Sequence, residues 1–367
     1  MRNSLIILFL SCQLFFSKEI SSQDLFFDRI EASYSYGYLA PHHDAMQHLF
    51  KGLFPSYQLS LSRQTSGSRA WHELYGYPDI GVRLSYTDLA YPEVLGRAYA
   101  IIPEVTFPVL RTSIYRINIT SGLGLGYLTK KYERLENYRN SAIGSNINLA
   151  FNFTIDNEFI IRKKYSVIAG IGLSHFSNGR VSTPNLGINI PSAKLGVSLI
   201  TPKKPKVTHS EDSSHDNRSS ELSVILSGGA AAEYPVGSKI NYRASLSSLF
   251  NYPINKKHKI GLGYDIFYYY NNPNLLAHLD EEAHISRFIN HGLFVGFQMD
   301  FSRLAFIIQK GIYIYDKYNY QNSFFYHRAG FRYSVYKNLI INLTMKTHFF
   351  RAQFIEIGLG YKFFKNE

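Results

Sequence analysis

The chain has 367 residues, a formal net charge of +12 and a single cysteine, Cys12, which lies in an apolar N-terminal segment. Once that segment is removed no thiol remains, which excludes disulfides, thiolate metal sites and cysteine nucleophiles. Aromatic residues make up 16% of the chain, with 29 Tyr and 27 Phe. In a secreted, aromatic-rich chain without a nucleic-acid-binding motif, the positive charge favours anionic lipid head groups over nucleic acid as partners.

The first residues have the three parts of a secretory signal peptide. Arg2 supplies the positive charge, Leu5 to Phe16 form the apolar segment, and residues 17–23 form a small and polar exit. The apolar segment is shorter than the roughly 20 residues that span a bilayer as a helix, which argues against the alternative of a membrane anchor. We therefore expect residues 1–22 to be a signal peptide.

Apolar residues recur at every second position along most of the mature chain, which is the period of a β-strand. Residues 115–127, 147–155 and 355–363 follow this pattern, with small or polar residues between the apolar ones. Beyond residue 23 no run of 18 apolar residues occurs. Segments of roughly ten residues with aromatic ends match tilted strands that cross a membrane better than the shorter strands of soluble sheets.

About sixteen such segments can be counted, eight before residue 202 and eight after residue 219. The fold class is therefore all-β, and we expect a transmembrane antiparallel β-barrel of the bacterial outer membrane with about 14–16 strands. Residues 202–219 are polar and lack apolar periodicity, so we expect a flexible linker there. It separates residues 23–201 from the C-terminal barrel strands in residues 220–367.

The longer segments between strands fall at one end of such a barrel if the first strand starts in the periplasm. They are residues 37–53, 128–145, 175–190 and 271–290, and they would lie outside the cell, as the long loops of outer-membrane barrels do. Residues 64–78 do not fit, because they fall at the periplasmic end, where short turns are expected. The sequence gives no reason for their length.

The strand that ends near residue 177 carries the strongest chemical signal. Its apolar residues from Val167 to Leu173 share one face, and counting by twos adds His175 and Ser177 to that face. An imidazole and a hydroxyl two residues apart on an apolar face suit a Ser–His pair that cleaves a lipid ester. On the returning strand, the same counting places Asn189 within cross-strand reach of His175.

The hairpin that holds these residues resembles a known family. The motif His175-x-Ser177-Asn178, followed by Pro184-Asn185-x-Gly187 and a strand at Leu195-Gly196, is similar to that of PagL-type lipid A 3-O-deacylases, also named acyloxyacyl hydrolases. The resemblance covers this strand pair closely and residues 28–201 loosely. It implies an outer-membrane serine esterase that removes an ester-linked acyl chain from the lipid A of lipopolysaccharide in the outer leaflet.

This sequence departs from the family in two respects. The family's barrel ends at the motif hairpin, whereas about eight more strands follow here. The alternative to one larger barrel is therefore an 8-stranded barrel unit plus a second β unit. The family also places a catalytic Glu fourteen residues after the His, where this chain has Asn189. An amide accepts the same hydrogen bond from an imidazole but supplies no charge.

We assign roles to the hairpin residues as a hypothesis. Ser177 is the nucleophile, His175 its general base and Asn189 the third member of the catalytic set. Asn178, or the backbone N–H groups near Gly179 and Gly187, would stabilise the oxyanion. Arg180 would meet a lipid A phosphate unless it is an ordinary loop charge, and the basic residues of the preceding outer loop would offer the same contact. The expected substrate-binding residues are Asn178, Arg180, Asn185 and Gly187.

Two other functions stay open on sequence alone. The first is a non-enzymatic porin or transporter, in which an aqueous lumen would be lined by Arg83, Arg116, Arg328 and Arg332. The second is a catalytically weak lipid-binding member of the family, because Asn189 lacks the charge of the family's Glu.

No cofactor or metal is expected. The chain has no phosphate-binding glycine loop and no dinucleotide fingerprint. His42, His43 and His48 lie together in the first outer loop, where Asp44 is the neighbouring carboxylate and no thiolate is present, and we expect no metal site there.

Overall fold

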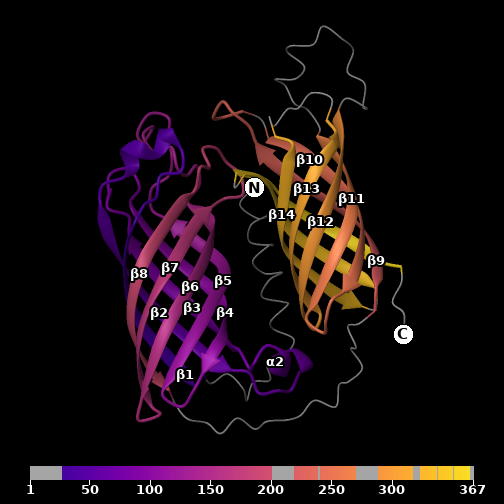
Figure 1. Ribbon diagram of the computed structural model, residues 1–367. Helices are drawn as coiled ribbons and strands as arrows, with labels where there is room; N and C mark the ends of the chain where they lie inside the picture. The colour runs from indigo at the N-terminus through magenta and orange to yellow at the C-terminus, as the bar shows by residue number, and fades with distance from the viewer. Residues whose placement is uncertain are drawn as a thin grey trace.

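In the computed structural model the chain forms two closed antiparallel β-barrels of eight strands each (Figure 1). The structure describes residues 27–200, 219–238, 240–269, 288–316, 323–336, 338–349 and 351–363. The expected signal peptide (1–22, with Cys12), almost all of the expected linker (202–219) and most of the expected outer segment 271–290 lie outside these residues.

Barrel 1 contains the first eight strands in sequence order. They are β1 (Arg29–Tyr38), β2 (Leu53–Gln64), β3 (Asp79–Asp88), β4 (Arg97–Arg111), β5 (Tyr115–Leu128), β6 (Ile147–Ile161), β7 (Tyr165–Ser177) and β8 (Ile188–Ile200). Each strand pairs with the next, and β8 returns to pair with β1 from Arg29↔Ile200 to Gly37↔Ser192.

Barrel 2 repeats this arrangement with the second eight strands. They are β9 (Glu221–Ala232), β10 (Ile240–Pro253), β11 (His258–Tyr269), β12 (Ile289–Phe301), β13 (Leu304–Tyr315), β14 (Phe325–Tyr336), β15 (Leu339–His348) and β16 (Arg351–Lys362). The closing pair is β9 with β16, from Ile357↔Gly228 to Lys362↔Ser223.

The predicted all-β class, the antiparallel barrel and the number of strands are confirmed. Of the two expected arrangements, the alternative is the one observed: an 8-stranded barrel plus a second β unit, which is itself a closed barrel. A single larger barrel does not form, because β8 hydrogen-bonds to β1 and leaves no free edge for β9. A period of two places side chains on faces, but it does not encode which strands meet at closure.

The apolar residues of each strand face outward, as expected for strands in lipid. On β7 and β8 the exposed fractions of Ile171 and Leu195 are 64% and 63%. Between them, inward-facing polar residues such as Ser166, Lys194 and Ser198 are buried. This pattern is the reverse of that in a soluble protein, and it is the pattern of a transmembrane barrel.

The interior of barrel 1 is filled by paired charges. Arg83 Nε lies 2.7 Å from Glu104 Oε2, and Arg29 Nη1 lies 2.8 Å from Glu158 Oε1. Lys194 Nζ contacts both Glu31 and Asp156, at 2.7 and 3.0 Å. The cavity among these side chains has a volume of about 20 Å³, enough for about one water molecule.

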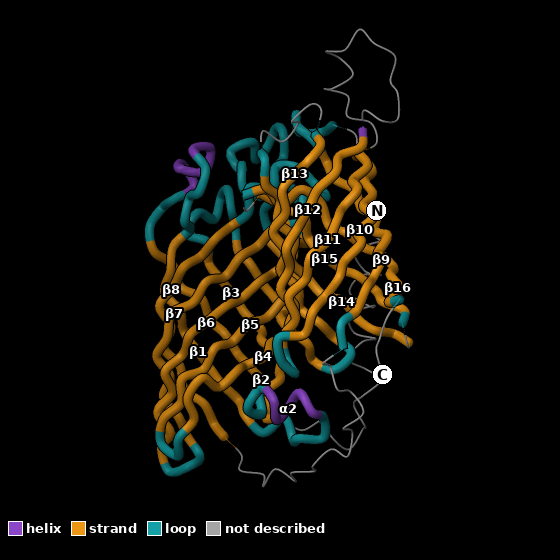
Figure 2. The backbone as a smooth tube through the Cα atoms, turned by 45° about the vertical axis from the view of Figure 1, so that its right-hand side comes forward, coloured by secondary structure: helices purple, strands orange, loops and turns teal. Residues whose placement is uncertain are grey.

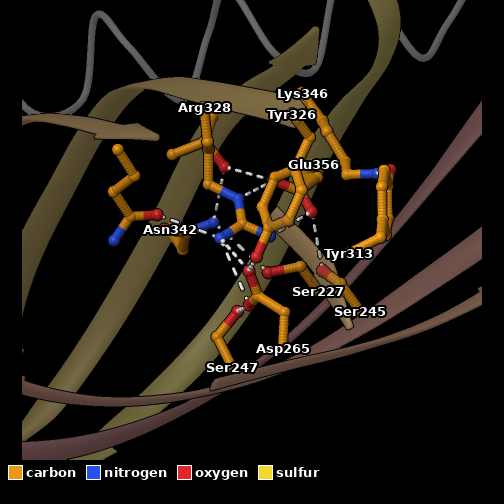
Figure 3. Close-up of polar contacts among 12 residues, drawn as sticks. Ser227, Ser245, Ser247, Asp265, Tyr313, Tyr326, Arg328, Asn342, Lys346 and Glu356 are labelled. Atoms are coloured by element: carbon orange, nitrogen blue, oxygen red, sulfur yellow. Dashed lines mark hydrogen bonds and ion pairs between the residues drawn. The ribbon is translucent and has the colours of Figure 1, made fainter. Parts of the chain in front are cut away.

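The interior of barrel 2 is organised around Arg328 (Figure 3). Its Nε lies 2.6 Å from Glu356 Oε2 and its Nη1 lies 3.2 Å from Asp265 Oδ2. Ser245 donates to Glu356 at 2.7 Å, and Tyr326 donates to Asp265 at 2.7 Å. The cluster is buried, so each charge depends on these partners for the stabilisation that water would otherwise give.

The arginines expected in a porin lumen therefore have another role. Arg83 and Arg328 point inward but form buried ion pairs, and Arg332 donates to Asn342 at 3.1 Å. Arg116 on β5 is half-buried. Eight strands leave an interior just wide enough for side chains, and here ion pairs and polar groups occupy it. The described parts of both barrels thus lack the lumen that a porin needs.

The two barrels lie side by side (Figures 1 and 2). They are in contact at the ends that the expected orientation places in the periplasm, here called the inner ends. The segment between β2 and β3 contains the short helix α2 (Ala70–Leu74). The rings of Trp71 and Tyr75 pack on Phe301 of barrel 2, with centroids 5.9 and 4.6 Å away. Tyr75 Oη donates to the Lys257 carbonyl at 3.4 Å, and burial raises the pKa of this phenol. Contact with barrel 2 explains the unexpected length of residues 64–78.

The other described helix, the 3₁₀ helix η1 (Asp44–Leu49), lies in the long connection between β1 and β2. In Figure 1 it is at the end of barrel 1 opposite α2. None of the described helices is long and apolar enough to cross a bilayer.

Arg328→Ala is expected to lower the free energy of unfolding of barrel 2 by about 3–5 kcal/mol, because it leaves the buried Asp265 and Glu356 without a counter-charge. Urea unfolding of the refolded protein in lipid vesicles measures this change. Lys256→Ala, in the exposed turn between β10 and β11, is the control and should change stability by less than about 0.5 kcal/mol. Equal unfolding midpoints for the two variants would show that the cluster is not stabilising.

Candidate active site

The candidate site lies at the outer end of barrel 1, where β7 ends and β8 begins. His175 continues the outward-facing row of Ile171 and Leu173 on β7. The register of the two strands places it directly opposite Asn189. The connection from residue 178 to residue 187, here named the site loop, joins the two strands.

The imidazole of His175 is held by an amide. His175 Nδ1 lies 2.6 Å from Asn189 Oδ1. Because an amide oxygen only accepts hydrogen bonds, Nδ1 carries the proton, which leaves the lone pair on Nε2. Nε2 is then the nitrogen that can act as a base.

The amide of Asn189 is in turn fixed by the first outer loop. Its Nδ2 donates to His42 Nδ1 at 3.0 Å, and its backbone carbonyl accepts from the Ala40 N–H at 2.9 Å. An amide rotated by half a turn would keep both side-chain contacts only if both imidazoles took the opposite tautomer. The Asn189 amide therefore couples the tautomer of His42 to that of His175.

Gly187 lies directly against the imidazole. Its φ is +83°, in the left-handed region that favours glycine. A Cβ at this position would be 2.8 Å from His175 Cε1, closer than van der Waals contact allows. The absence of a side chain at residue 187 thus makes room for the ring.

Ser177 is the last residue of β7, shares the face of His175 by strand parity, and is only 6% exposed. Within the described part of the chain, no hydrogen bond joins its hydroxyl to His175. Catalytic hydrogen bonds are often long or absent in unliganded enzymes and tighten when substrate binds.

The residues expected to form an oxyanion site are partly engaged already. The Asn178 N–H donates to Asn185 Oδ1 at 2.9 Å, and Asn178 Nδ2 donates one hydrogen to Ser145 Oγ at 2.8 Å. The Gly187 N–H donates to the Ala142 carbonyl at 3.0 Å, which removes it as an oxyanion donor. Among the described residues the Gly179 N–H has no acceptor, and Asn178 Nδ2 keeps a second hydrogen.

Arg180 points toward barrel 2. Its Nε donates to the Ala232 carbonyl at 3.1 Å, and its Nη2 forms an ion pair with Glu233. The sequence predicts that Arg180 binds a lipid A phosphate, but in the structure its guanidinium is already paired with a carboxylate. Strand parity gave no warning of this contact, because Glu233 lies in the other barrel.

The three histidines of the first outer loop have separate partners. His42 contacts Asn189, His43 Nδ1 accepts from the Ala45 N–H at 3.2 Å, and His48 Nε2 bonds to the Arg139 carbonyl at 2.7 Å. No group of three or more metal-ligating side chains occurs in the described part of the chain.

Several residues of the site were not found from the sequence. Ala142 and Ser145 reach it from the loop between β5 and β6, and Glu233 reaches it from barrel 2. His42 was noted only as a candidate metal ligand. A strand pattern carries no signal for such contacts, because they come from loops that closure of barrel 1 and contact with barrel 2 bring together.

Two family models match the chain. The model described as Lipid A 3-O-deacylase (PagL) matches residues 56–198, and the model described as Acyloxyacyl hydrolase, C-terminal domain, matches residues 220–366. No curated protein matches the chain in sequence.

The chain is also similar to solved outer-membrane barrels. The structure of the outer membrane enzyme PagL is 19% identical, with a TM-score of 0.32, over 45% of this chain and 97% of that chain. Neisserial surface protein A is 10% identical, with a TM-score of 0.33, over 47% of this chain and 96% of that chain.

Outward apolar rows around polar interiors define both units as outer-membrane β-barrels. The first family model begins in β2 and ends in β8, and the second covers β9 to β16. The chain belongs to the PagL family of lipid A deacylases, and its second barrel is the acyloxyacyl hydrolase C-terminal domain.

Gly187→Ala is expected to lower the rate of fatty-acid release about 100-fold, because the added Cβ displaces the His175 ring. The assay measures initial rates on lipopolysaccharide. Gly52→Ala is the matched control: its φ of +111° is also in the region that favours glycine, but nothing lies within 4 Å of the added Cβ. Similar losses in both variants would mean that strain, and not the imidazole contact, is responsible.

Proposed function

We propose that this protein is a serine esterase that removes an ester-linked acyl chain from lipid A, with Ser177 as nucleophile and His175 as general base. The observation that carries the proposal is the 2.6 Å contact from His175 Nδ1 to Asn189 Oδ1. It leaves Nε2 of a lipid-facing imidazole as a base on the same strand face as a serine hydroxyl. The family membership supports lipid A as the substrate.

The reaction proceeds through an acyl-enzyme. The Ser177 hydroxyl turns toward His175 Nε2, gives it the proton and attacks the acyl carbonyl. The bond from the carbonyl carbon to the sugar oxygen breaks, and the imidazolium returns the proton to that oxygen. Water, deprotonated by Nε2, then attacks the acyl-enzyme, which releases the fatty acid and restores Ser177.

The oxyanion is stabilised by N–H groups that are not fully used in other hydrogen bonds. The Gly179 N–H has no acceptor among the described residues, and Asn178 Nδ2 uses only one hydrogen on Ser145. Both residues directly follow the nucleophile in sequence. Donors placed in advance stabilise the developing negative charge without reorganisation during the reaction.

Asn189 acts as a positioning residue without a charge. It fixes the tautomer and the direction of the imidazole, as a carboxylate does, but it does not compensate the charge of the imidazolium. His42 completes this arrangement by accepting a hydrogen bond from the amide nitrogen.

Lipid A reaches this site without leaving the membrane. His175 lies on the outward face near the outer end of β7, where the acyl esters of outer-leaflet lipids are found. Because Arg180 is engaged with Glu233, the exposed Lys130, Arg134 and Arg139 of the neighbouring outer loop are better placed to meet the phosphates.

A second candidate function is that of a lipid-binding family member with weak activity. Two observations favour it: the third residue is a neutral amide, and no hydrogen bond joins the Ser177 and His175 side chains in the described part of the chain. The two functions differ in whether cells that produce the protein release fatty acid from lipid A.

Ser177→Ala and His175→Ala should each abolish deacylation, with a loss of roughly 1,000-fold or more, because each removes a group that takes part in bond making. Mass spectrometry of lipid A from cells with the unmodified protein, each variant and no protein measures the lost acyl chain. Heat-dependent gel mobility checks that the barrels assemble. Full deacylation by either variant would overturn the assigned chemistry, and no deacylation by the unmodified protein would favour the lipid-binding candidate.

Asn189→Ala should lower the rate roughly tenfold, because one hydrogen bond of about 1.4 kcal/mol is lost from the imidazole. Asn189→Glu should raise it above that of the unmodified protein by stabilising the imidazolium. His42→Ala should reduce the rate when residue 189 is Asn but have little effect in the Asn189→Glu variant, since a carboxylate has two acceptor oxygens and needs no fixed orientation. Initial rates of the unmodified protein, the three single variants and the His42→Ala/Asn189→Glu double variant test this, and an equal His42→Ala effect in both backgrounds contradicts it.

A further inference from the structure

The site loop is docked against barrel 2 at the outer end of the molecule. The Ala232 N–H donates to the Arg180 carbonyl at 2.8 Å, and Arg180 Nε donates to the Ala232 carbonyl at 3.1 Å. A residue of the loop is thereby paired, through both backbone and side chain, with the end of β9. Barrel 2 therefore contacts the site loop close in sequence to the proposed nucleophile, Ser177.

A chain of buried charges strengthens the contact. Glu233 forms ion pairs with Arg180 of the site loop and with Arg243 on β10. Glu233 and Arg243 are only 5% and 6% exposed, and Arg243 Nη1 also donates to the Gln353 carbonyl at 3.2 Å. The carboxylate is thus anchored to the wall of barrel 2 while it holds the loop.

The backbone held in this way is strained. Gly179 and Arg180 have φ values of +64° and +69°, and for a residue with a Cβ this conformation costs about 1 kcal/mol or more. A Cβ on Gly179 would lie 2.5 Å from Ile355 Cδ1 on β16, so the loop backbone packs directly on barrel 2. Without these partners the two residues have little reason to keep the left-handed conformation.

Contacts farther along the loop also come from barrel 2. Thr183 Oγ1 donates to the Glu233 carbonyl at 3.4 Å. Burial raises the pKa of the Tyr234 phenol, while a hydrogen bond with the Asn185 backbone partly lowers that pKa. The Asn185 side chain in turn accepts from the Asn178 N–H, so contacts with barrel 2 at Thr183 and beside Asn185 add to the one at Arg180.

We infer that barrel 2 is a positioning element of the active site, and that Glu233 is a positioning residue which acts through Arg180. The ion pair holds Gly179 and Arg180 in the left-handed conformation directly after Ser177 and Asn178, and so fixes the oxyanion donors. The role of Arg180 is accordingly to tie the loop to barrel 2, not to bind a lipid phosphate. This inference rests on the proposed esterase function.

Kinetics of the full-length protein on lipopolysaccharide test the inference. Glu233→Gln keeps the size of the side chain but removes its charge, and it should lower kcat between roughly 10-fold and 100-fold with little change in KM. Arg180→Ala should have the same effect, and the double variant should be no worse than either single one, because both break one interaction. Glu233→Asp should retain part of the activity.

A matched control separates positioning from assembly. Trp71→Ala weakens the barrel contact at the opposite end, where no site residue lies, and should leave kcat unchanged. A serine-reactive phosphonate should label Ser177 more slowly in Glu233→Gln, whereas heat-dependent gel mobility should be that of the unmodified protein. Reduced kcat in Trp71→Ala to the same extent as in Glu233→Gln would overturn the inference in favour of general assembly.

Two further outcomes are decisive against it. If Arg180→Ala raises KM while Glu233→Gln leaves kcat unchanged, Arg180 binds the lipid and does not tie the loop. If the unmodified protein releases no fatty acid, the proposed function itself fails. If only the positioning role of Glu233 is wrong, the result differs: the unmodified protein is active, and the Glu233→Gln variant is fully active as well.

Discussion

The hydrocarbon interior of a bilayer offers no hydrogen-bond partner to a peptide group, so a chain of strands must close on itself. This chain closes twice, with β8 on β1 and β16 on β9. An 8-stranded barrel is just wide enough for its own side chains, and buried pairs such as Arg83–Glu104 and Arg328–Glu356 fill the two interiors. Because the insides are occupied, a functional site has to lie on the outside or at the rim.

The candidate site lies on the outside of barrel 1, as its filled interior requires. His175 sits in a row of side chains that face lipid, near the outer end of its strand. A substrate with its ester bond at the membrane interface can reach such a site by lateral diffusion. The imidazole still needs a fixed tautomer in this setting, and it hydrogen-bonds to Asn189 at 2.6 Å, which in turn hydrogen-bonds to His42 at 3.0 Å.

The two barrels are joined by contacts of different physical kinds. At the inner end, Trp71 and Tyr75 pack on Phe301, which is an apolar contact with no link to the chemistry. At the outer end, buried charges join the site loop to barrel 2 through Glu233. The apolar contact holds the barrels together, while the charged one is specific in direction and reaches the residues beside Ser177. The C-terminal barrel thus has a physical connection to the site that the first barrel alone would lack.

The sequence by itself determined the features that depend only on residues close together in the chain. Its period of two predicted the strands and their outward faces, and counting by twos placed His175, Ser177 and Asn189 on one face, since side-chain direction in a strand is a local property. Only the tertiary structure decided that the strands close as two barrels, that Arg180 pairs with Glu233, and that His42 hydrogen-bonds to Asn189. These contacts join residues 53 and 147 positions apart, and no local pattern records which distant loops the closure and contact of the barrels will bring together.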